Sequence, residues 1–267
     1  MRADGRSNTR VLRVLCGVLG KETVHFFGAI RFFTRLPVPA RVGHAAEGLE
    51  HAMRYFPAVG VLVGALAALS FSIFASFLPK SPALLASIAL TVLLTGVFHE
   101  DGWGDMVDGF GNTWTKESAL EIMKDSRLGT FGAVALVLML VARFFILVEV
   151  PASRLPSALV AGHAVSRLCV LLIQHSMVYA RADGKTKPLA APIASNELAF
   201  AALTAFLPLL LLPLVPAFLA VVFALAALCW LTRLFRRRIG GYTGDCLGAA
   251  QQFSEVAFYL GLSCAAS

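Results

Sequence analysis

"SPALLASIALTVLLTGVFHEDGWGDMVDG", from Ser81 to Gly109, joins an 18-residue run without a charged side chain to three closely spaced aspartates. An uncharged run of this length approaches the roughly 20 residues that an α-helix needs to cross a bilayer. If the helix continues through Asp108, its period of about 3.6 residues places Asp101, Asp105 and Asp108 within about 60° of one another around the axis. The stretch therefore predicts a membrane helix whose end carries an acidic face.

The composition of the whole chain points the same way. Of its 267 residues, 58% are hydrophobic and 15% are charged, and the mean hydropathy is +0.75. A soluble domain of this length cannot bury that much apolar surface. We therefore expect an all-α, polytopic integral membrane protein. The five cysteines lack paired or metal-type spacing, which argues against a disulfide framework or a zinc site.

Apolar segments define the expected architecture of one domain, residues 1–267. Residues 1–55 form an N-terminal extension with an interfacial helix and a loop, because apolar and charged residues alternate over about 11–36. Residues 56–265 form the transmembrane bundle, with active-site loops at 99–130 and 233–245. Seven spans are expected, at about 56–78, 81–98, 131–150, 157–179, 198–213, 216–232 and 246–265.

Basic residues predict the orientation of the bundle. The loops that would share one side hold fourteen Lys or Arg residues: 31–55, 99–130, 180–197 and 233–245. The turns at 79–82 and 151–156 hold only Lys80 and Arg154. Because basic loops stay inside, the larger loops should face the cytoplasm from a bacterial inner membrane. The net charge of +7 lies mostly on that side, where it would meet membrane lipid and phosphorylated metabolites. We expect no nucleic acid partner, and the sequence leaves homo-oligomer formation open.

The acidic face suggests a metal site. Three carboxylates on one face repel one another unless a cation lies between them. A hard ion such as Mg²⁺ prefers oxygen ligands and leaves room for water and substrate phosphates. Asp101, Asp105 and Asp108 are therefore the predicted ligands, and the neighbouring glycines would let a bulky molecule approach the backbone. The alternative is a solvated acidic loop at a helix end.

Six fragments in order resemble one known family. They are "FFTRLPVP" (Phe32–Pro39), "FPAVGVLVG" (Phe56–Gly64), "FHEDGWGDMVDG" (Phe98–Gly109), "KDSRLGTFG" (Lys124–Gly132), "AVSR" (Ala164–Arg167) and "GGYTGDCLGA" (Gly240–Ala249). Each is a weak match alone, but together they cover nearly the whole chain with suitable membrane spacing. The chain thus resembles the cobalamin synthase family, the adenosylcobinamide-GDP ribazoletransferases.

The resemblance implies a reaction in cobalamin biosynthesis. Members of the family transfer adenosylcobinamide phosphate from adenosylcobinamide-GDP to alpha-ribazole or its 5'-phosphate, release GMP and require Mg²⁺. A carboxylate-held metal would supply the charge neutralisation that cleavage of a diphosphate needs. The resemblance also places Asp101, Asp105 and Asp108 at the family's acidic positions.

Three further residues are candidates for catalysis. His99 could take the proton of the attacking hydroxyl, or it could be an orienting or structural residue. Asp125 could complete the metal shell or act as a base. Arg127 could bind a phosphate with both arms of its guanidinium. The alternative for these last two residues is a local pair between them.

Candidate substrate-binding residues lie in the matched fragments. Arg35 belongs to "FFTRLPVP". Gly241 and Gly244 form a flexible turn whose amides could meet an anion, and Asp245 is expected to cap the last helix. Arg167 belongs to "AVSR" and is expected roughly 18 Å deep in the membrane, given a rise of about 1.5 Å per residue.

Arg143 is expected at a similar depth, with Glu255 and His163 as candidate partners for these intramembrane arginines. A buried structural network and a substrate contact are both compatible with this pattern.

Two other functions stay open on the sequence. A lipid-headgroup phosphotransferase of the CDP-alcohol type uses similar chemistry, but Phe110 and Gly111 depart from the pattern expected after its aspartate motif. A membrane transporter would also account for arginines and a histidine inside the bilayer.

Overall fold

The computed structural model describes residues 20–39, 49–181 and 190–264. Within them the chain is helical and contains no strand, which confirms the all-α class. The elements are α2 (Leu49–Ala52), η1 (Met53–Tyr55), α3 (Phe56–Ala75), α4 (Lys80–Thr95), α5 (Phe98–Asn112), α6 (Lys116–Ile122), α7 (Thr130–Glu149), α8 (Leu155–Ser176), α9 (Ser195–Phe206), η3 (Leu207–Leu211), α10 (Leu214–Ile239) and α11 (Gly244–Ser263).

Each of the seven apolar segments of the sequence contains a helix. In the described part of the chain, four helices are long and apolar enough to cross a membrane, namely α3 with η1, α7, α8 and α10. The bent pair α4 and α5 would make a fifth span, while α9 with η3 is shorter. Length and composition thus support a membrane bundle, and the number of seven spans stays a prediction. Pro208 lies in η3, at the expected break between α9 and α10.

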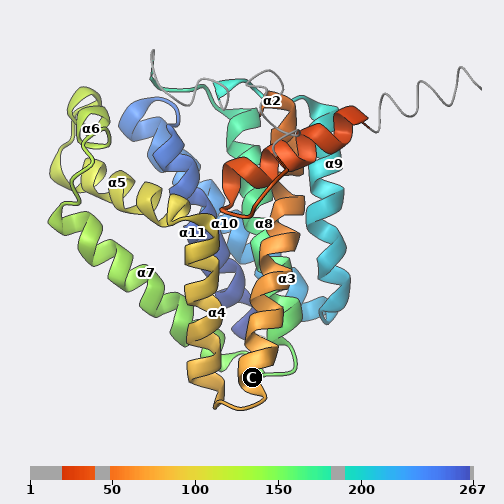
Figure 1. Cartoon of the computed structure of the whole chain (residues 1–267). Helices are drawn as coiled ribbons and strands as arrows, with labels where there is room; N and C mark the ends of the chain where they lie inside the picture. Colours follow the sequence, from red (N-terminus) through yellow and green to blue (C-terminus); the bar gives the residue numbers. More distant parts are fainter. Residues whose placement is uncertain (1–19, 40–48, 182–189, 265–267) are drawn as a thin grey trace, which may run out of the picture.

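The N-terminal helix, residues 20–33, lies across the upper end of the bundle (Figure 1). It is joined to the bundle by an ion pair of 2.5 Å between Glu22 and Arg54. Arg54 also contacts Glu197 of α9 at 3.3 Å. This placement agrees with the expected interfacial helix, of which residues 11–19 lie outside the described part of the chain.

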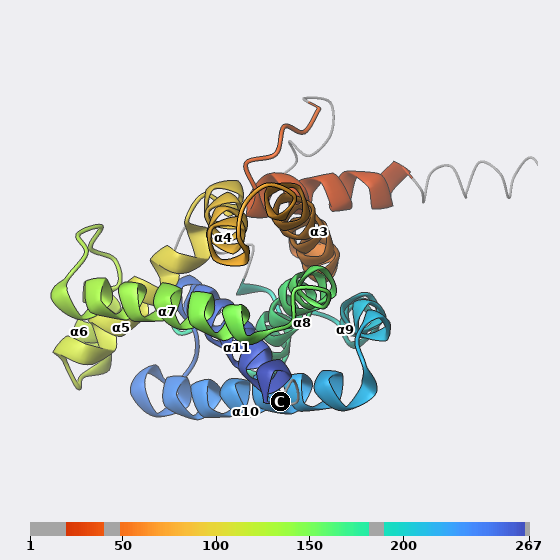
Figure 2. The same ribbon diagram turned by 90° about the horizontal axis from the view of Figure 1, so that it is seen from below.

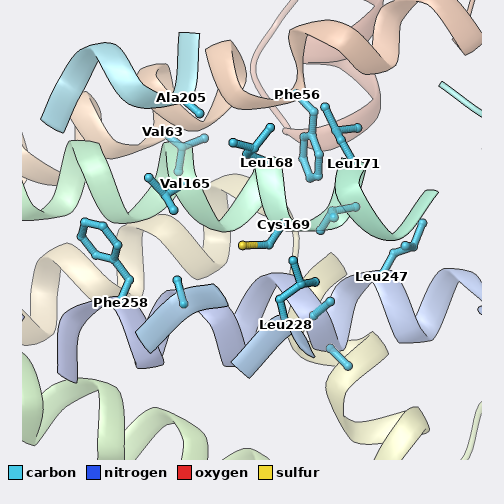
Figure 3. Packing of buried hydrophobic residues seen from close by; sticks show 14 of the residues in the cluster. Phe56, Val63, Val165, Leu168, Cys169, Leu171, Ala205, Leu228, Leu247 and Phe258 are labelled. Atoms are coloured by element: carbon cyan, nitrogen blue, oxygen red, sulfur yellow. The ribbon is translucent and has the colours of Figure 1, made fainter. Parts of the chain in front are cut away.

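Helices α8 and α11 lie in the middle of the bundle (Figure 2). In the most apolar window of α8, 78% of the residues are buried, against 28% in α7. Glycines allow α3 to approach α8 closely, because a Cβ at Gly60 would lie 2.3 Å from the His163 carbonyl oxygen. Figure 3 shows the side chains that fill this contact and the adjoining ones, among them Phe56, Val63, Val165, Leu168, Leu171, Leu228, Leu247 and Phe258.

The expectation of one continuous helix through Asp108 is wrong. The axes of α4 and α5 differ by 84°. Gly96 ends α4 with φ +69°, and Val97 follows with φ 65°, so two successive residues are left-handed. Glycine adopts that conformation without strain, whereas valine pays about 1 to 2 kcal/mol. As a result, α5 lies across the upper end of the bundle instead of continuing along α4 (Figure 1).

The described parts of the larger loops gather at this same end. Figure 1 shows α5, α6, the start of α7 and the start of α11 at the upper end, while the turns that follow α3 and α7 lie at the lower end. This arrangement agrees with the predicted grouping of the basic loops on one side.

Candidate active site

The acidic face of α5 is built against the first turn of α11. These helices touch backbone to backbone, because a Cβ on Gly102 would lie 2.9 Å from the Asp245 carbonyl oxygen. A Cβ on Gly248 would lie 3.2 Å from the Cα of Gly102. Only glycine on both helices permits this crossing. The crossing carries Asp245 toward the aspartates of α5, a proximity that sequence spacing could not reveal.

The crossing brings three carboxylates together. We call Asp101, Asp105 and Asp245 the acidic cluster. Burial, followed by repulsion from Asp101 and Asp245, raises the pKa of Asp105 to about 7. Burial also raises the pKa of Asp245, while the nearby Arg181 lowers it. Asp101 is exposed and Asp105 is half-buried, so the cluster is open to solvent.

Asp245 does not cap α11, contrary to expectation. The N-cap is Thr243, whose hydroxyl accepts a hydrogen bond of 3.2 Å from the Cys246 amide. Gly244 is the first residue of α11. The Asp245 carboxylate does not contact the free amides of α11 and instead accepts a hydrogen bond of 2.8 Å from Arg181.

Arg181 is a site residue that the sequence did not single out. It follows a short backbone pairing in which the Ala180 amide donates to the Tyr242 carbonyl at 2.8 Å and the Tyr242 amide to Val178 at 3.0 Å. Gly241 makes this pairing feasible, since a Cβ there would lie 2.3 Å from the Val178 carbonyl oxygen. The structure therefore gives Gly241 a packing role beside the site.

The Asp108 carboxylate contacts the start of α7. It is buried, and its two carboxylate oxygens accept hydrogen bonds from the amides of Gly129 at 2.7 Å and Gly132 at 2.8 Å. These amides belong to the first turn of α7, where the helix dipole favours a negative charge. The structure thus gives this predicted metal ligand another role, which is to cap α7 from the neighbouring helix.

Asp125 and Arg127 pair with each other. The Arg127 guanidinium donates to Asp125 at 2.6 Å and 3.0 Å, and these hydrogen bonds lower the pKa of the carboxyl. The Arg127 side chain is 87% exposed. The local pair, one of the two alternatives considered for these residues, is therefore the arrangement in the structure. A contact with substrate stays a prediction.

His99, Arg35 and Arg167 lie apart from the acidic cluster. His99 is buried at the start of α5, beside the rings of Phe56 and Phe98. Arg35 is exposed above the bend, and a Cβ on the left-handed Gly96 would lie 2.5 Å from its Nε. None of these contacts tests a role in catalysis or substrate binding, so those roles stay predictions.

Arg167 belongs to a buried network within the bundle. It donates to the His163 carbonyl oxygen at 2.9 Å. Glu255 pairs with Arg143 at 2.7 Å and with His163 at 2.9 Å, which confirms Glu255 as the partner expected from the sequence. Removing one member of such a network leaves an uncompensated charge in a buried site. The network therefore links α7, α8 and α11.

A second buried link runs from this network to α5. Gln252 of α11 donates to Glu100 of α5 at 3.0 Å and to the side chain of Gln251 at 3.0 Å. Gln251 in turn donates to Glu255 at 2.6 Å. Glutamines within an apolar helix were the only sequence signal for this chain of hydrogen bonds, which fixes the rotation of α5 on α11.

The donor set of the acidic cluster suits a hard cation. Among the described residues, no group of three or more His, Cys, Asp and Glu side chains is placed so that it could hold a metal ion by itself. Mg²⁺ rarely requires one, because it is usually held by one or two carboxylates, with water and substrate phosphates as the other ligands. Burial, followed by repulsion from the neighbouring carboxylates, raises the pKa of Asp105 to about 7, and a bound cation would relieve the repulsion. The residues therefore fit a Mg²⁺ ion that is bound by the protein and by the substrate together.

Comparison with known proteins adds independent information. No solved structure matches this chain. A protein of Ralstonia nicotianae named adenosylcobinamide-GDP ribazoletransferase is 47% identical over 232 residues, which cover 85% of this chain and 90% of the relative. Proteins of the same name from Polaromonas sp. and Shewanella frigidimarina are 43% and 46% identical, each over 88% of this chain and over 94% and 92% of the relatives. The family model described as cobalamin-5-phosphate synthase matches residues 25–263. The chain therefore belongs to the cobalamin-5-phosphate synthase family.

Proposed function

We propose that this protein joins the two halves of cobalamin. A hydroxyl oxygen of alpha-ribazole, or of its 5'-phosphate, attacks the phosphorus that carries adenosylcobinamide in adenosylcobinamide-GDP. The bond from that phosphorus to the bridging oxygen breaks, GMP leaves with the bridging oxygen, and the hydroxyl proton passes to a base or to water. Support comes from the names of the relatives and from the family match over residues 25–263.

The observation that carries this proposal is the acidic cluster at one end of a membrane bundle. One or two carboxylates of the acidic cluster would hold Mg²⁺ together with water and substrate phosphates, and Mg²⁺ would neutralise charge on the diphosphate oxygens. The two helices of the cluster are fixed against each other by the glycine crossing and by the hydrogen bond between Glu100 and Gln252. This rigidity holds the carboxylates at a constant separation. We leave Asp108 out of the ligand set, because both of its oxygens accept hydrogen bonds from α7.

The location of the reaction is part of the proposal. We place the upper end of Figure 1 in the cytoplasm of a bacterium, with α5 at the surface of the inner membrane. The basic residues of the larger loops support this orientation. Nucleotide-activated substrates would then reach the acidic cluster directly from the side on which they are made.

The direct test uses the purified protein in detergent with adenosylcobinamide-GDP, alpha-ribazole and Mg²⁺. GMP and a cobalamin product should appear together, and omission of acceptor or addition of a chelator should stop both. Asp101→Asn should abolish most turnover, whereas Glu117→Gln, which changes an exposed acid on α6, should not. Absence of GMP release in well-folded protein would refute the proposal. Product formation from CDP-activated lipid alone would favour a lipid-headgroup phosphotransferase.

A further inference from the structure

Arg181 contacts the acidic cluster through one arm of its guanidinium. Its Nη2 lies 2.8 Å from Asp245 Oδ2, and the two side chains are only 13% and 21% exposed. The Nε of Arg181 is buried and has no hydrogen-bond partner among the described residues. The guanidinium therefore uses its Nη2 donor but not its Nε donor, although a buried donor normally has an acceptor.

The backbone at Arg181 is held in place, while its side chain is free to rotate toward another partner. The pairing of Val178 and Ala180 with Tyr242 holds residues 178–180 against the turn before α11. Arg181 is the next residue, so its Cα is anchored beside Asp245. A guanidinium on a stem of three methylene groups can turn from such an anchor by rotating its side-chain bonds alone.

Charge decides which partner the guanidinium takes. Without a metal, Arg181 is the cation that offsets the repulsion in the cluster, and it lowers the pKa of both Asp105 and Asp245. A divalent cation at the same carboxylates would repel the guanidinium. A nucleoside diphosphate that arrives with the cation offers it phosphate oxygens, which match the two-pronged geometry of arginine.

We propose that Arg181 is a substrate-binding residue that exchanges partners: it pairs with Asp245 in the metal-free protein and with the diphosphate of the nucleotide substrate once a divalent cation occupies the acidic cluster. This inference rests on the proposed function, and it assigns a role to a residue outside the matched fragments. The exchange couples metal binding to nucleotide binding. The metal displaces Arg181 from Asp245, which frees Arg181 for the nucleotide, and the nucleotide draws the Arg181 charge away from the metal site.

The exchange predicts opposite effects of one substitution on two ligands. Arg181→Ala removes the competing cation, so Mn²⁺, used as a probe and followed by electron paramagnetic resonance, should bind more tightly in the absence of nucleotide. The same variant should bind GDP in the presence of Mn²⁺ about tenfold to a hundredfold more weakly, as expected for loss of a hydrogen bond to a charged group. Arg181→Lys keeps the charge but lacks the fork, so it should retain wild-type Mn²⁺ affinity while GDP binding weakens.

Arg237→Ala is the matched control, because Arg237 is an exposed arginine in the last turn of α10. Arg237→Ala should leave the affinities for Mn²⁺ and for GDP unchanged. If it changed them as much as Arg181→Ala does, the effect of Arg181→Ala would come from net charge alone. Weaker binding of both ligands by Arg181→Ala, with a lower melting temperature, would show a merely structural ion pair and overturn the proposal. Unchanged affinities would overturn it as well. If the wild-type protein binds Mn²⁺ and releases GMP, such results reject the exchange alone. If it binds no Mn²⁺, the proposed metal site fails too.

Discussion

Substitution of Asp108 by asparagine distinguishes a structural aspartate from the metal ligands that we propose on the same helix. The carboxylate accepts two hydrogen bonds, from the amides of Gly129 at 2.7 Å and Gly132 at 2.8 Å. Asparagine has one acceptor oxygen, so its amide group must face one of these two N–H donors. One charge-assisted hydrogen bond is lost, worth about 1.5 to 3 kcal/mol, together with up to about 1 kcal/mol from the charge at the N-terminus of α7.

The expected loss of stability is therefore about 2 to 4 kcal/mol, a sum of these two contributions. Unfolding in detergent, followed by circular dichroism, would measure it. Asp101→Asn is the matched control, since Asp101 is exposed on the same helix and has no such partners; it should retain the stability of the wild type and lose activity. The reasoning fails if Asp108→Asn unfolds like the wild-type protein, and it fails most clearly if that stable variant no longer binds Mn²⁺.

Three further expectations can be measured directly. Asp105→Asn should stabilise the metal-free protein, because the pKa of Asp105 is raised from 3.8 to about 7 and its ionised form is disfavoured on folding. The gain in melting temperature over the wild type should grow from about pH 4 to pH 7 and level off above pH 7. A gain that does not depend on pH would count against this explanation. Glu255→Gln should cost about 3 to 5 kcal/mol in detergent unfolding, because it leaves Arg143 buried without a countercharge, and Arg143→Met in the same chain should restore part of the loss if the pair is what matters. Cysteines introduced at Ser118 and Ser153 should label from opposite sides of intact cells, with Ser153→Cys accessible from outside, and the reverse labelling would invert the orientation.

The sequence predicted the helices well because each depends on local pattern. Charge-free runs mark the apolar helices, and Pro208 marks a break that the structure contains. The bend after α4 was harder to foresee. Gly96 is compatible with a helix end, but the second left-handed residue is Val97, and a β-branched residue normally avoids that conformation.

Prediction of the site was limited for a different reason. Helical spacing placed Asp101, Asp105 and Asp108 on one face, and that face is present in α5. What each aspartate touches depends on α7 and α11, which meet α5 only in the folded chain. Arg181 was missed because its neighbourhood carries no recognisable pattern. Its position depends on a backbone pairing with Tyr242, some sixty residues further along.

The ion pair between Arg143 and Glu255 also constrains how the protein is made. Arg143 and Arg167 are synthesised well before Glu255, which lies in the last helix. Each arginine near the centre of a membrane helix opposes insertion by about 2.5 to 3.5 kcal/mol. The apolar residues of α7 and α8 offset this cost, but the arginines have no carboxylate partner in the bundle until α11 is made. A chain that stops before Glu255 therefore lacks the countercharge of Arg143 as well as its last helix.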